Sequence, residues 1–260
     1  MGDHIHYEVV GHVATITIDR PEKRNAMTWA MLADFHAAVR RAGGDEAARV
    51  VIVTGVPGAF CAGTDLADLA STPEESRGRR DAPAEPARWW PLVACPKPVI
   101  GAVDGPAVGM GAEFTSQCDL RLATPNARFA WNFVHRGLVP DTGAGSWLLP
   151  RIVGVQRALQ LLYTGDFLTA DDALKVGYVL DVVASDALLD RANALAEAVL
   201  TGSPHSQRLI KQLVYEGLAR GVDEHMAQHT YALEACFKSD DHREGVAAFL
   251  ERRPAHFTGT

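Results

Sequence analysis

Short apolar runs alternate with helical patterns over the first two-thirds of the chain. Residues 50–55 form a β-branched run that is typical of a strand buried on both faces. Residues 27–41 carry apolar side chains at helical spacing and precede two glycines, which predicts a helix. The same reasoning predicts strands at 4–10, 13–18, 98–103, 120–123 and 128–130, and a helix at 109–117. This alternation favours an α/β architecture with right-handed crossovers.

The chain after Ala184 carries only helical patterns. We predict helices at 186–200, 206–219, 225–237 and 241–252. Their apolar stripes need a surface to pack against, which is either the α/β body or a neighbouring subunit. Residues 71–88, by contrast, are rich in Pro, Arg, Glu and Ala, and we predict an exposed loop there.

Composition excludes several classes of protein. The 260 residues are 47% hydrophobic and 22% charged, as in an ordinary globular protein. A formal net charge of -7 argues against nucleic-acid binding, because that needs concentrated Lys and Arg. The sequence has no signal-peptide pattern and no apolar run long enough to span a membrane. The four cysteines have no CxxC spacing, so we expect reduced thiols in a cytoplasmic protein.

Two glycine-containing turns, each directly after a predicted buried strand, are the first candidates for chemistry. They are Cys61-Ala62-Gly63 followed by Thr64, and Gly109-Met110-Gly111. Glycine permits conformations that expose backbone amides, and the first amides of a helix have no intrahelical acceptor. Such amides stabilise an oxyanion. Each turn taken alone is also compatible with a plain packing turn.

Further motifs place these turns in a recognisable order. The run FCAGTDL at 60–66 is followed by AVDGPAVGMGAE at 102–113, and DRPEKRNAM, GLVPDTGAGSWLLPRIVG and FLERRPAHF extend the match. The chain thereby resembles the crotonase (enoyl-CoA hydratase/isomerase) family over nearly its whole length, and only 71–88 falls outside the match. The resemblance implies an α/β, crotonase-like spiral of ββα units over residues 1–195. It also implies a C-terminal all-helical trimerisation region, residues 196–260, that packs on the core and on neighbouring subunits.

The resemblance implies an enzyme that acts on enoyl-CoA thioesters through an enolate, in fatty-acid or related acyl-CoA metabolism. Hydration and isomerisation both stay open. The implied partners are the acyl-CoA substrate and further copies of the chain, in a homotrimer or homohexamer, with no nucleic acid, no membrane, no metal and no cofactor beyond the coenzyme A of the substrate. The alternatives are a hydrolase, a carbon–carbon bond-cleaving or dehalogenating enzyme that uses Asp141, and a non-catalytic CoA-binding relative.

The resemblance also assigns substrate-binding roles. The oxyanion hole falls on the backbone N–H groups of Thr64 and Met110, and we expect the Met110 side chain to narrow the pocket because the family usually has Gly or Ala there. Contacts to the acyl-CoA are implied for Lys23, Arg24, Ala26, Ala62, Asp65, Leu66, Gly109, Phe133, Arg252, Arg253 and Phe257. The basic side chains among them are equally compatible with solvated surface charge. We expect Phe257 to cover the adenine from an adjoining chain.

Two carboxylates are the candidate catalytic residues. Glu113 matches the first glutamate of a hydratase, but the position of the second falls on Phe133. Asp141 matches a carboxylate of double-bond isomerases, although the stretch around it is one residue longer than is usual in the family. A carboxylate among apolar residues has a raised pKa, which suits general acid–base catalysis. Glu113 is also compatible with a helix-dipole role and Asp141 with an ordinary turn.

Overall fold

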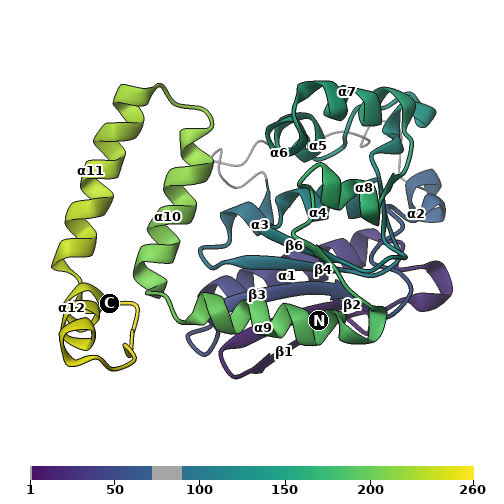
Figure 1. Cartoon of the computed structure of the whole chain (residues 1–260). Helices are drawn as coiled ribbons and strands as arrows, with labels where there is room; N and C mark the ends of the chain where they lie inside the picture. Colours follow the sequence, from purple (N-terminus) through teal and green to yellow (C-terminus); the bar gives the residue numbers. More distant parts are fainter. Residues whose placement is uncertain (1, 72–89) are drawn as a thin grey trace.

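The computed structural model describes residues 2–71 and 90–260, and a six-stranded β-sheet forms the centre of this part of the chain (Figure 1). The strands lie in the order β1 (Ile5–Val10), β2 (Val13–Ile18), β3 (Val50–Gly55), β4 (Val99–Val103), β6 (Leu120–Ala123) and β9 (Asp181–Val182). β1 and β2 form an antiparallel hairpin, and the later pairs are parallel. All five residues of β4 are buried, as expected for a parallel strand that is covered on both faces.

Residues of β2, β3, β4 and β6 contribute to two separate hydrophobic clusters. On β3, Val51 and Val53 belong to the larger cluster, whereas Val50 and Ile52 belong to the smaller one on the other face. Helices α1 (Trp29–Gly44) and α4 (Met110–Gln117) pack in the larger cluster. Helix α9 (Leu188–Leu200) packs in the smaller one, against β3, β4 and β6. The sheet is therefore covered on both faces by helices of the same chain.

A smaller sheet determines where the candidate turns lie. It consists of β5 (Pro106–Val108), β7 (Arg128–Ala130) and β8 (Leu168–Thr169) among the described residues. A parallel β-bridge between Cys61 and Ala107 joins the segment after β3 to β5. Because β5 leads directly into α4, this bridge brings the two glycine turns to one place.

The C-terminal helices form an arm that extends from the core (Figure 1). The arm consists of α10 (Pro204–Gly217), α11 (Val222–Lys238) and α12 (Asp240–Glu251). No residue of α10 or α11 is buried within the single chain. The expected limit of the core after residue 195 falls inside α9, whose buried face continues to Ala196. We therefore propose that the core ends with α9 and that the arm begins at α10.

Many elements agree with the sequence pattern. Strands are found at the expected limits at 13–18, 50–55, 120–123 and 128–130. The expected helix at 27–41 begins later, at Trp29, because the Thr28 side chain accepts a hydrogen bond from the Met31 amide and caps the helix there. The four C-terminal helices are confirmed with limits that shift by up to three residues.

The structure departs from the sequence pattern in the middle of the chain. The pattern predicts no element at 131–184, but the chain forms several short ones there: η4 (Asn132–Arg136), α5 (Ala144–Trp147), α6 (Leu149–Val153), α7 (Val155–Thr164), β8, α8 (Ala170–Lys175) and β9. Three further short helices lie nearer the N-terminus: η1 (Pro21–Lys23), α2 (Leu66–Ser71) and α3 (Pro91–Ala94). Except for Ser71, the loop expected at 71–88 lies outside the described residues. No helix in the described part of the chain is long and apolar enough to cross a membrane.

Candidate functional site

The first glycine turn is held on both sides by backbone hydrogen bonds. The Cys61 amide donates to the Pro106 carbonyl at 3.0 Å, and the Val108 amide donates to the Cys61 carbonyl at 2.9 Å. On the other side, the Ala62 amide donates to the Arg24 carbonyl at 3.0 Å, and the Gly63 carbonyl accepts from Met27. The turn after β3 is therefore fixed between β5 and the segment that follows η1.

Gly63 brings the first turn into contact with the second. Its φ of +99° is a conformation that L side chains rarely adopt. A Cβ atom placed on Gly63 would lie 2.9 Å from the Val108 carbonyl oxygen and 3.8 Å from the Met110 amide nitrogen. Neither the Thr64 amide nor the Met110 amide is a donor in any backbone hydrogen bond between described residues. Two unpaired N–H groups therefore lie at the same place, an arrangement that can bind an oxyanion.

The second turn starts a fully buried helix. Gly109, with φ +54°, is the N-cap of α4, and its amide donates to the Ala130 carbonyl at 2.8 Å. The N-terminus of α4 adds a partial positive charge beside the Met110 amide. A Cβ atom on Gly111 would lie only 2.1 Å from the Cys61 carbonyl oxygen, so α4 approaches the first turn as closely as glycine permits.

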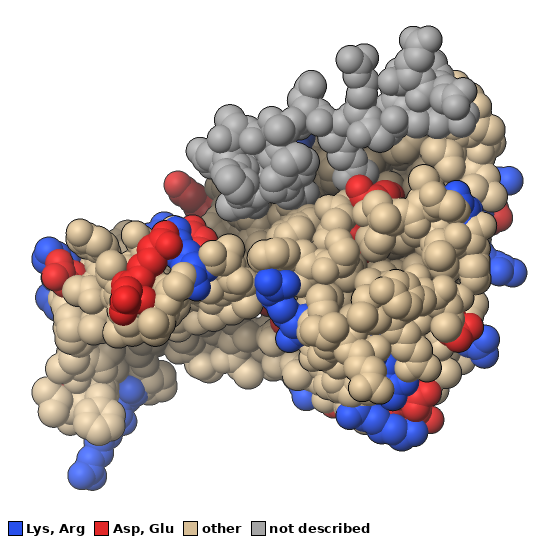
Figure 2. All heavy atoms as spheres, turned by 90° about the horizontal axis from the view of Figure 1, so that it is seen from above, with Lys and Arg blue, Asp and Glu red and all other residues tan. Residues whose placement is uncertain are grey.

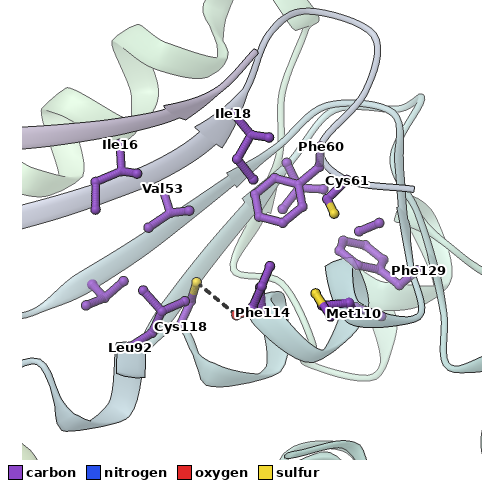
Figure 3. Close-up of a cluster of buried hydrophobic side chains, with 14 of the residues drawn as sticks. Ile16, Ile18, Val53, Phe60, Cys61, Leu92, Met110, Phe114, Cys118 and Phe129 are labelled. Carbon is purple, nitrogen blue, oxygen red and sulfur yellow. Dashed lines mark hydrogen bonds between the residues drawn. The ribbon is translucent and has the colours of Figure 1, made fainter. Parts of the chain in front are cut away.

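The Met110 side chain is part of the hydrophobic core. It is 2% exposed and belongs to the larger cluster. Figure 3 shows it among Phe60, Cys61, Phe114 and Phe129. The family motif with Gly or Ala at this position led us to expect a narrowed pocket, but the thioether fills space in the core below the turn, and the backbone N–H remains unpaired.

Glu113 is buried on α4 with both carboxylate oxygens hydrogen-bonded. Thr142 Oγ1 donates to Oε2, and the Gly145 amide donates to Oε1 at 2.8 Å. The pKa of this carboxyl is raised to about 7 overall: burial is the largest cause, the nearby charge of Asp141 also raises it, and the hydrogen bonds from Thr142, Gly145 and Ala144 lower it. A carboxyl with a pKa near neutrality can both accept and return a proton.

Asp141 lies in the turn before α5, and the structure brings it close to Glu113. Its negative charge raises the pKa of two buried groups, the Glu113 carboxyl and the Cys61 thiol. The first of these groups lies at the start of α4 and the second precedes the first glycine turn. Asp141 directly precedes Thr142, whose hydroxyl donates to Glu113, so its turn lies beside the start of α4.

Phe133 also borders the second turn. It lies on η4 and is 8% exposed. A Cβ atom on Gly109 would lie 3.8 Å from Phe133 Cζ. The side chain at this position is thus a buried apolar ring beside the turn, and it can neither accept nor donate a proton.

The residues expected to hold the coenzyme fall into two groups, and the first surrounds the first glycine turn. Lys23, Arg24, Ala26, Ala62, Asp65 and Leu66 lie there, with Lys23, Arg24 and Leu66 exposed. The Asp65 carboxylate forms an ion pair of 2.7 Å with Arg20, and this hydrogen bond holds the pKa of Asp65 below its usual range. Asp65 therefore has a structural partner of its own.

The second group lies on the arm, away from the two turns of the same chain (Figure 1). Arg253 forms ion pairs with Glu244, at 2.6 Å, and with Glu251, at 2.7 Å. Arg252 is exposed at the C-terminal end of α12, and Phe257 packs near Gly245 on the same helix. One chain does not bring Arg252, Arg253 and Phe257 together with the turns.

Asn25 is a site-supporting residue that the sequence analysis missed. It is fully buried, its Nδ2 donates to the Ala59 carbonyl at 2.7 Å, and its Oδ1 accepts from the Arg20 amide at 2.7 Å. The first bond connects the segment after η1 to the loop between β3 and the first turn, and the second connects it to the residue before η1. In the sequence, Asn25 is only a single polar residue before the apolar pair Ala26-Met27. This pattern does not identify the residues to which its side chain is hydrogen-bonded.

The described residues show no arrangement for a metal. No group of three or more His, Cys, Asp or Glu side chains among them is placed to hold an ion. Cys61, Cys95, Cys118 and Cys236 are free cysteines in this structure, and burial raises the pKa of the first three thiols.

Comparisons with known proteins agree with the geometry. The family model for enoyl-CoA hydratase/isomerase matches residues 8–260. The chain is 36% identical to a crotonyl-CoA hydratase of Syntrophomonas wolfei, over 94% of each chain, and 35% identical to a 1,2-epoxyphenylacetyl-CoA isomerase of Escherichia coli, over 95% of each. The crystal structure of an enoyl-CoA hydratase from Bacillus anthracis superposes with a TM-score of 0.91 at 30% identity, covering 99% of this chain and 100% of that one.

Proposed function

We propose that this chain, which belongs to the enoyl-CoA hydratase/isomerase family, moves the double bond of an enoyl-CoA thioester. It is an enzyme of that family, which includes both hydratases and isomerases. The observation that favours isomerisation is Phe133, an apolar ring at the position where the resemblance expects the second glutamate of a hydratase. Hydration requires a positioned water as well as proton transfer, whereas migration of a double bond requires proton transfer alone.

The proposed reaction begins at the two unpaired amides. The thioester oxygen accepts hydrogen bonds from the N–H groups of Thr64 and Met110, which stabilise negative charge on that oxygen. A carboxylate removes a proton from C2 of a 3-enoyl-CoA, and the electron pair of the broken C–H bond forms the dienolate. Return of a proton to C4 regenerates the thioester carbonyl with the double bond between C2 and C3. One proton leaves and one returns, so no cofactor is consumed.

Glu113 and Asp141 are the proposed proton carriers. The raised pKa of Glu113 supports its part in both steps, since the group then neither holds nor releases the proton too strongly near neutral pH. The charge interaction between the two carboxyls supports their action as a pair. Because the two carboxyls interact, the apparent pKa values of a titration describe Glu113 and Asp141 together.

The proposed assembly is a homotrimer. Large apolar side chains are exposed on the arm, such as Tyr231 (69%) and Phe249 (82%), and also on the core, such as Val139 (79%) and Tyr163 (71%). Figure 2 shows wide areas without charged side chains on one face of both regions. Two different apolar surfaces on one chain favour head-to-tail contacts, which close into a ring. Such contacts carry the second group of coenzyme residues to a neighbouring site. A cytoplasmic location stays a prediction.

Two substrates and two pairs of variants test the function. We expect faster conversion of a 3-enoyl-CoA to the 2-enoyl-CoA than hydration of crotonyl-CoA. Glu113→Gln and Asp141→Asn each lose roughly 10²–10⁴ in kcat/KM, because each removes a group that carries the proton. The matched controls are Glu46→Gln and Asp166→Asn, which change exposed carboxylates and leave the rate as in the wild type.

Faster hydration of crotonyl-CoA than isomerisation would show that Phe133 does not exclude hydration. Turnover of neither substrate, together with tight binding of both, would support a CoA-binding protein. A covalent adduct at Asp141, detected by mass spectrometry, would favour the hydrolytic or dehalogenating alternative.

A further inference from the structure

The Glu113 carboxyl is held in place by a turn that is distant from it in the sequence. Its hydrogen bonds come from residues 142–145, at the start of α5: Thr142 Oγ1 donates to Oε2, the Gly145 amide donates to Oε1 at 2.8 Å, and the Ala144 amide also stabilises the carboxylate. A hydrogen bond to each oxygen fixes the plane of the carboxyl. The two oxygens together have about four acceptor positions, so a position remains available to substrate.

The Thr142 hydroxyl accepts one hydrogen bond and donates another, and together these bonds fix its orientation. The Ala144 amide donates to Thr142 Oγ1 at 3.2 Å, so the oxygen is already an acceptor on that side. A hydroxyl has one proton to donate, and here that proton goes to Glu113 Oε2. The hydroxyl is therefore oriented before any substrate binds.

The turn itself is anchored from two further sides. The Trp90 indole Nε1, at the start of α3, donates to the Thr142 carbonyl at 2.9 Å. A Cβ atom on Gly145 would lie 2.4 Å from Glu113 Oε1 and 2.7 Å from Trp131 Cδ1, so the turn packs directly against the carboxyl and the buried indole. Movement of Thr142 would therefore disturb contacts at both tryptophans.

We infer that Thr142 is a positioning residue for Glu113, its hydroxyl holding the carboxyl in the orientation that transfers the substrate proton. This inference rests on the proposed function, in which Glu113 carries the proton. Trp90 holds the Thr142 backbone through its carbonyl, so its effect on Glu113 is indirect and passes through Thr142. The sequence motif alone does not indicate this role, because Thr142 and Glu113 are 29 positions apart.

The decisive comparison is Thr142→Val with Thr142→Ser. Valine keeps the shape of threonine and removes the hydroxyl, whereas serine keeps the hydroxyl. For Thr142→Val we expect kcat on a 3-enoyl-CoA to fall roughly 10–100-fold, the range for loss of a hydrogen bond to a charged group, with little change in KM. Thr142→Ser retains most of the wild-type kcat. Trp90→Phe shows a smaller loss in the same direction.

The pH profile separates positioning from simple loss of packing. The hydrogen bond from Thr142 lowers the pKa of Glu113, so its removal raises that pKa. The acid limb of the kcat/KM profile therefore moves to higher pH in Thr142→Val and stays in place in Thr142→Ser. Equal damage in both variants would overturn the inference, since it would show that the side-chain shape matters and the hydroxyl does not. A wild-type kcat and profile in Thr142→Val would overturn it as well.

A measurement without turnover keeps this test apart from the test of function. The carboxyl stretching band of Glu113, assigned by its loss in Glu113→Gln, can be titrated by infrared spectroscopy in the wild type and in Thr142→Val, with circular dichroism to check folding. We expect the midpoint to move to higher pH in Thr142→Val. An unchanged midpoint contradicts the role of Thr142 even if no substrate is turned over. A shifted midpoint without isomerase activity contradicts the proposed function alone.

Discussion

All eight residues of α4 are buried within one chain, whereas α10 and α11 together have no buried residue. The polar side chains of α4 mostly have partners: Thr115 Oγ1 and Ser116 Oγ both contact the Tyr178 hydroxyl, at 2.7 and 3.3 Å. Burial of polar groups costs free energy unless they are hydrogen-bonded, and the chain supplies the bonds of Thr115 and Ser116 itself, whereas both polar atoms of the Gln117 side chain have no partner among the described residues. Helix α4, which carries Glu113 and Met110, is therefore fully packed within one chain.

The arm completes its packing only at its base. Lys211 on α10 donates to the Leu92 and Lys97 carbonyls, at 2.9 and 3.0 Å, and pairs with Asp119 at 2.8 Å. The Tyr215 hydroxyl donates to the other oxygen of Asp119 at 2.9 Å. Beyond this anchor, apolar side chains of the arm remain in solvent. The core therefore buries the site within one chain, whereas most of the arm stays uncovered, as the proposed assembly with further copies of the chain would explain.

The largest expected effect concerns assembly. The double substitution Phe249→Asp with Leu250→Asp puts charges at side chains that are 82% and 75% exposed in one chain, so it should spare the fold and remove the trimer. We expect a loss of roughly 4 kcal/mol or more per interface, because two side chains of hot-spot size are lost at about 2 kcal/mol or more each. Analytical ultracentrifugation measures the mass.

Val10→Asp is the control for this change. Val10 is also exposed, at 72%, but it lies on the edge strand of the core and outside the arm. We expect the mass of this variant to equal that of the wild type. A double variant that keeps the wild-type mass would show that the end of the arm is not an interface.

The next effect concerns the anchor between arm and core. Lys211→Met keeps the length of the side chain but removes the positive charge that pairs with the Asp119 carboxylate and the donor to two carbonyls. Removing one member of a buried ion pair costs about 3–5 kcal/mol. Urea unfolding at one fixed protein concentration measures the loss, since assembly makes stability concentration-dependent.

An exposed ion pair provides the contrast. Lys175 pairs with Asp172 at 3.2 Å, and both side chains are more than half exposed. Lys175→Met should change the free energy of unfolding by less than about 1 kcal/mol. Similar losses for the two lysine variants would mean that the anchor contributes no more than an ordinary surface pair.

The sequence predicts most elements of both the core and the arm. Residues 50–55 and 98–103 are continuous apolar runs, and such runs in an α/β pattern indicate strands with both faces covered. The strand at 50–55 is confirmed as β3, and the strand expected at 98–103 is β4, which begins one residue later, at Val99. The arm helices are also predictable, because Ser203 and Ser239 cap them: each side chain accepts a hydrogen bond from an amide three residues on. Local patterns thus define most elements.

Contacts between distant segments are what the sequence does not predict. The short helices of 131–184 are too brief and too interrupted by glycine for a helical period to emerge. The partner of Arg253 is Glu244, which only the geometry of α12 and its end brings near. For the candidate site, the motifs indicate Glu113 and the two amides, but the hydrogen bonds from Thr142 and Gly145 depend on how the turn before α5 folds back.

The smallest effect is the pH dependence that Glu113 gives to the core. Its pKa is raised to about 7 in the folded chain from an ordinary value of 4.5, so the folded state holds the proton more tightly than the unfolded state. Its contribution to stability is therefore complete below about pH 4.5 and is lost as pH rises through about 7.

Glu113→Gln is neutral at every pH and escapes this loss. We expect the two proteins to have similar free energies of unfolding at pH 5, and the variant to be more stable at pH 8, by on the order of 1–3 kcal/mol. Urea unfolding at both pH values measures the difference. Glu46→Gln, an exposed change, should show none. An equal offset at both pH values would mean that Glu113 does not change its charge in the folded core over this range.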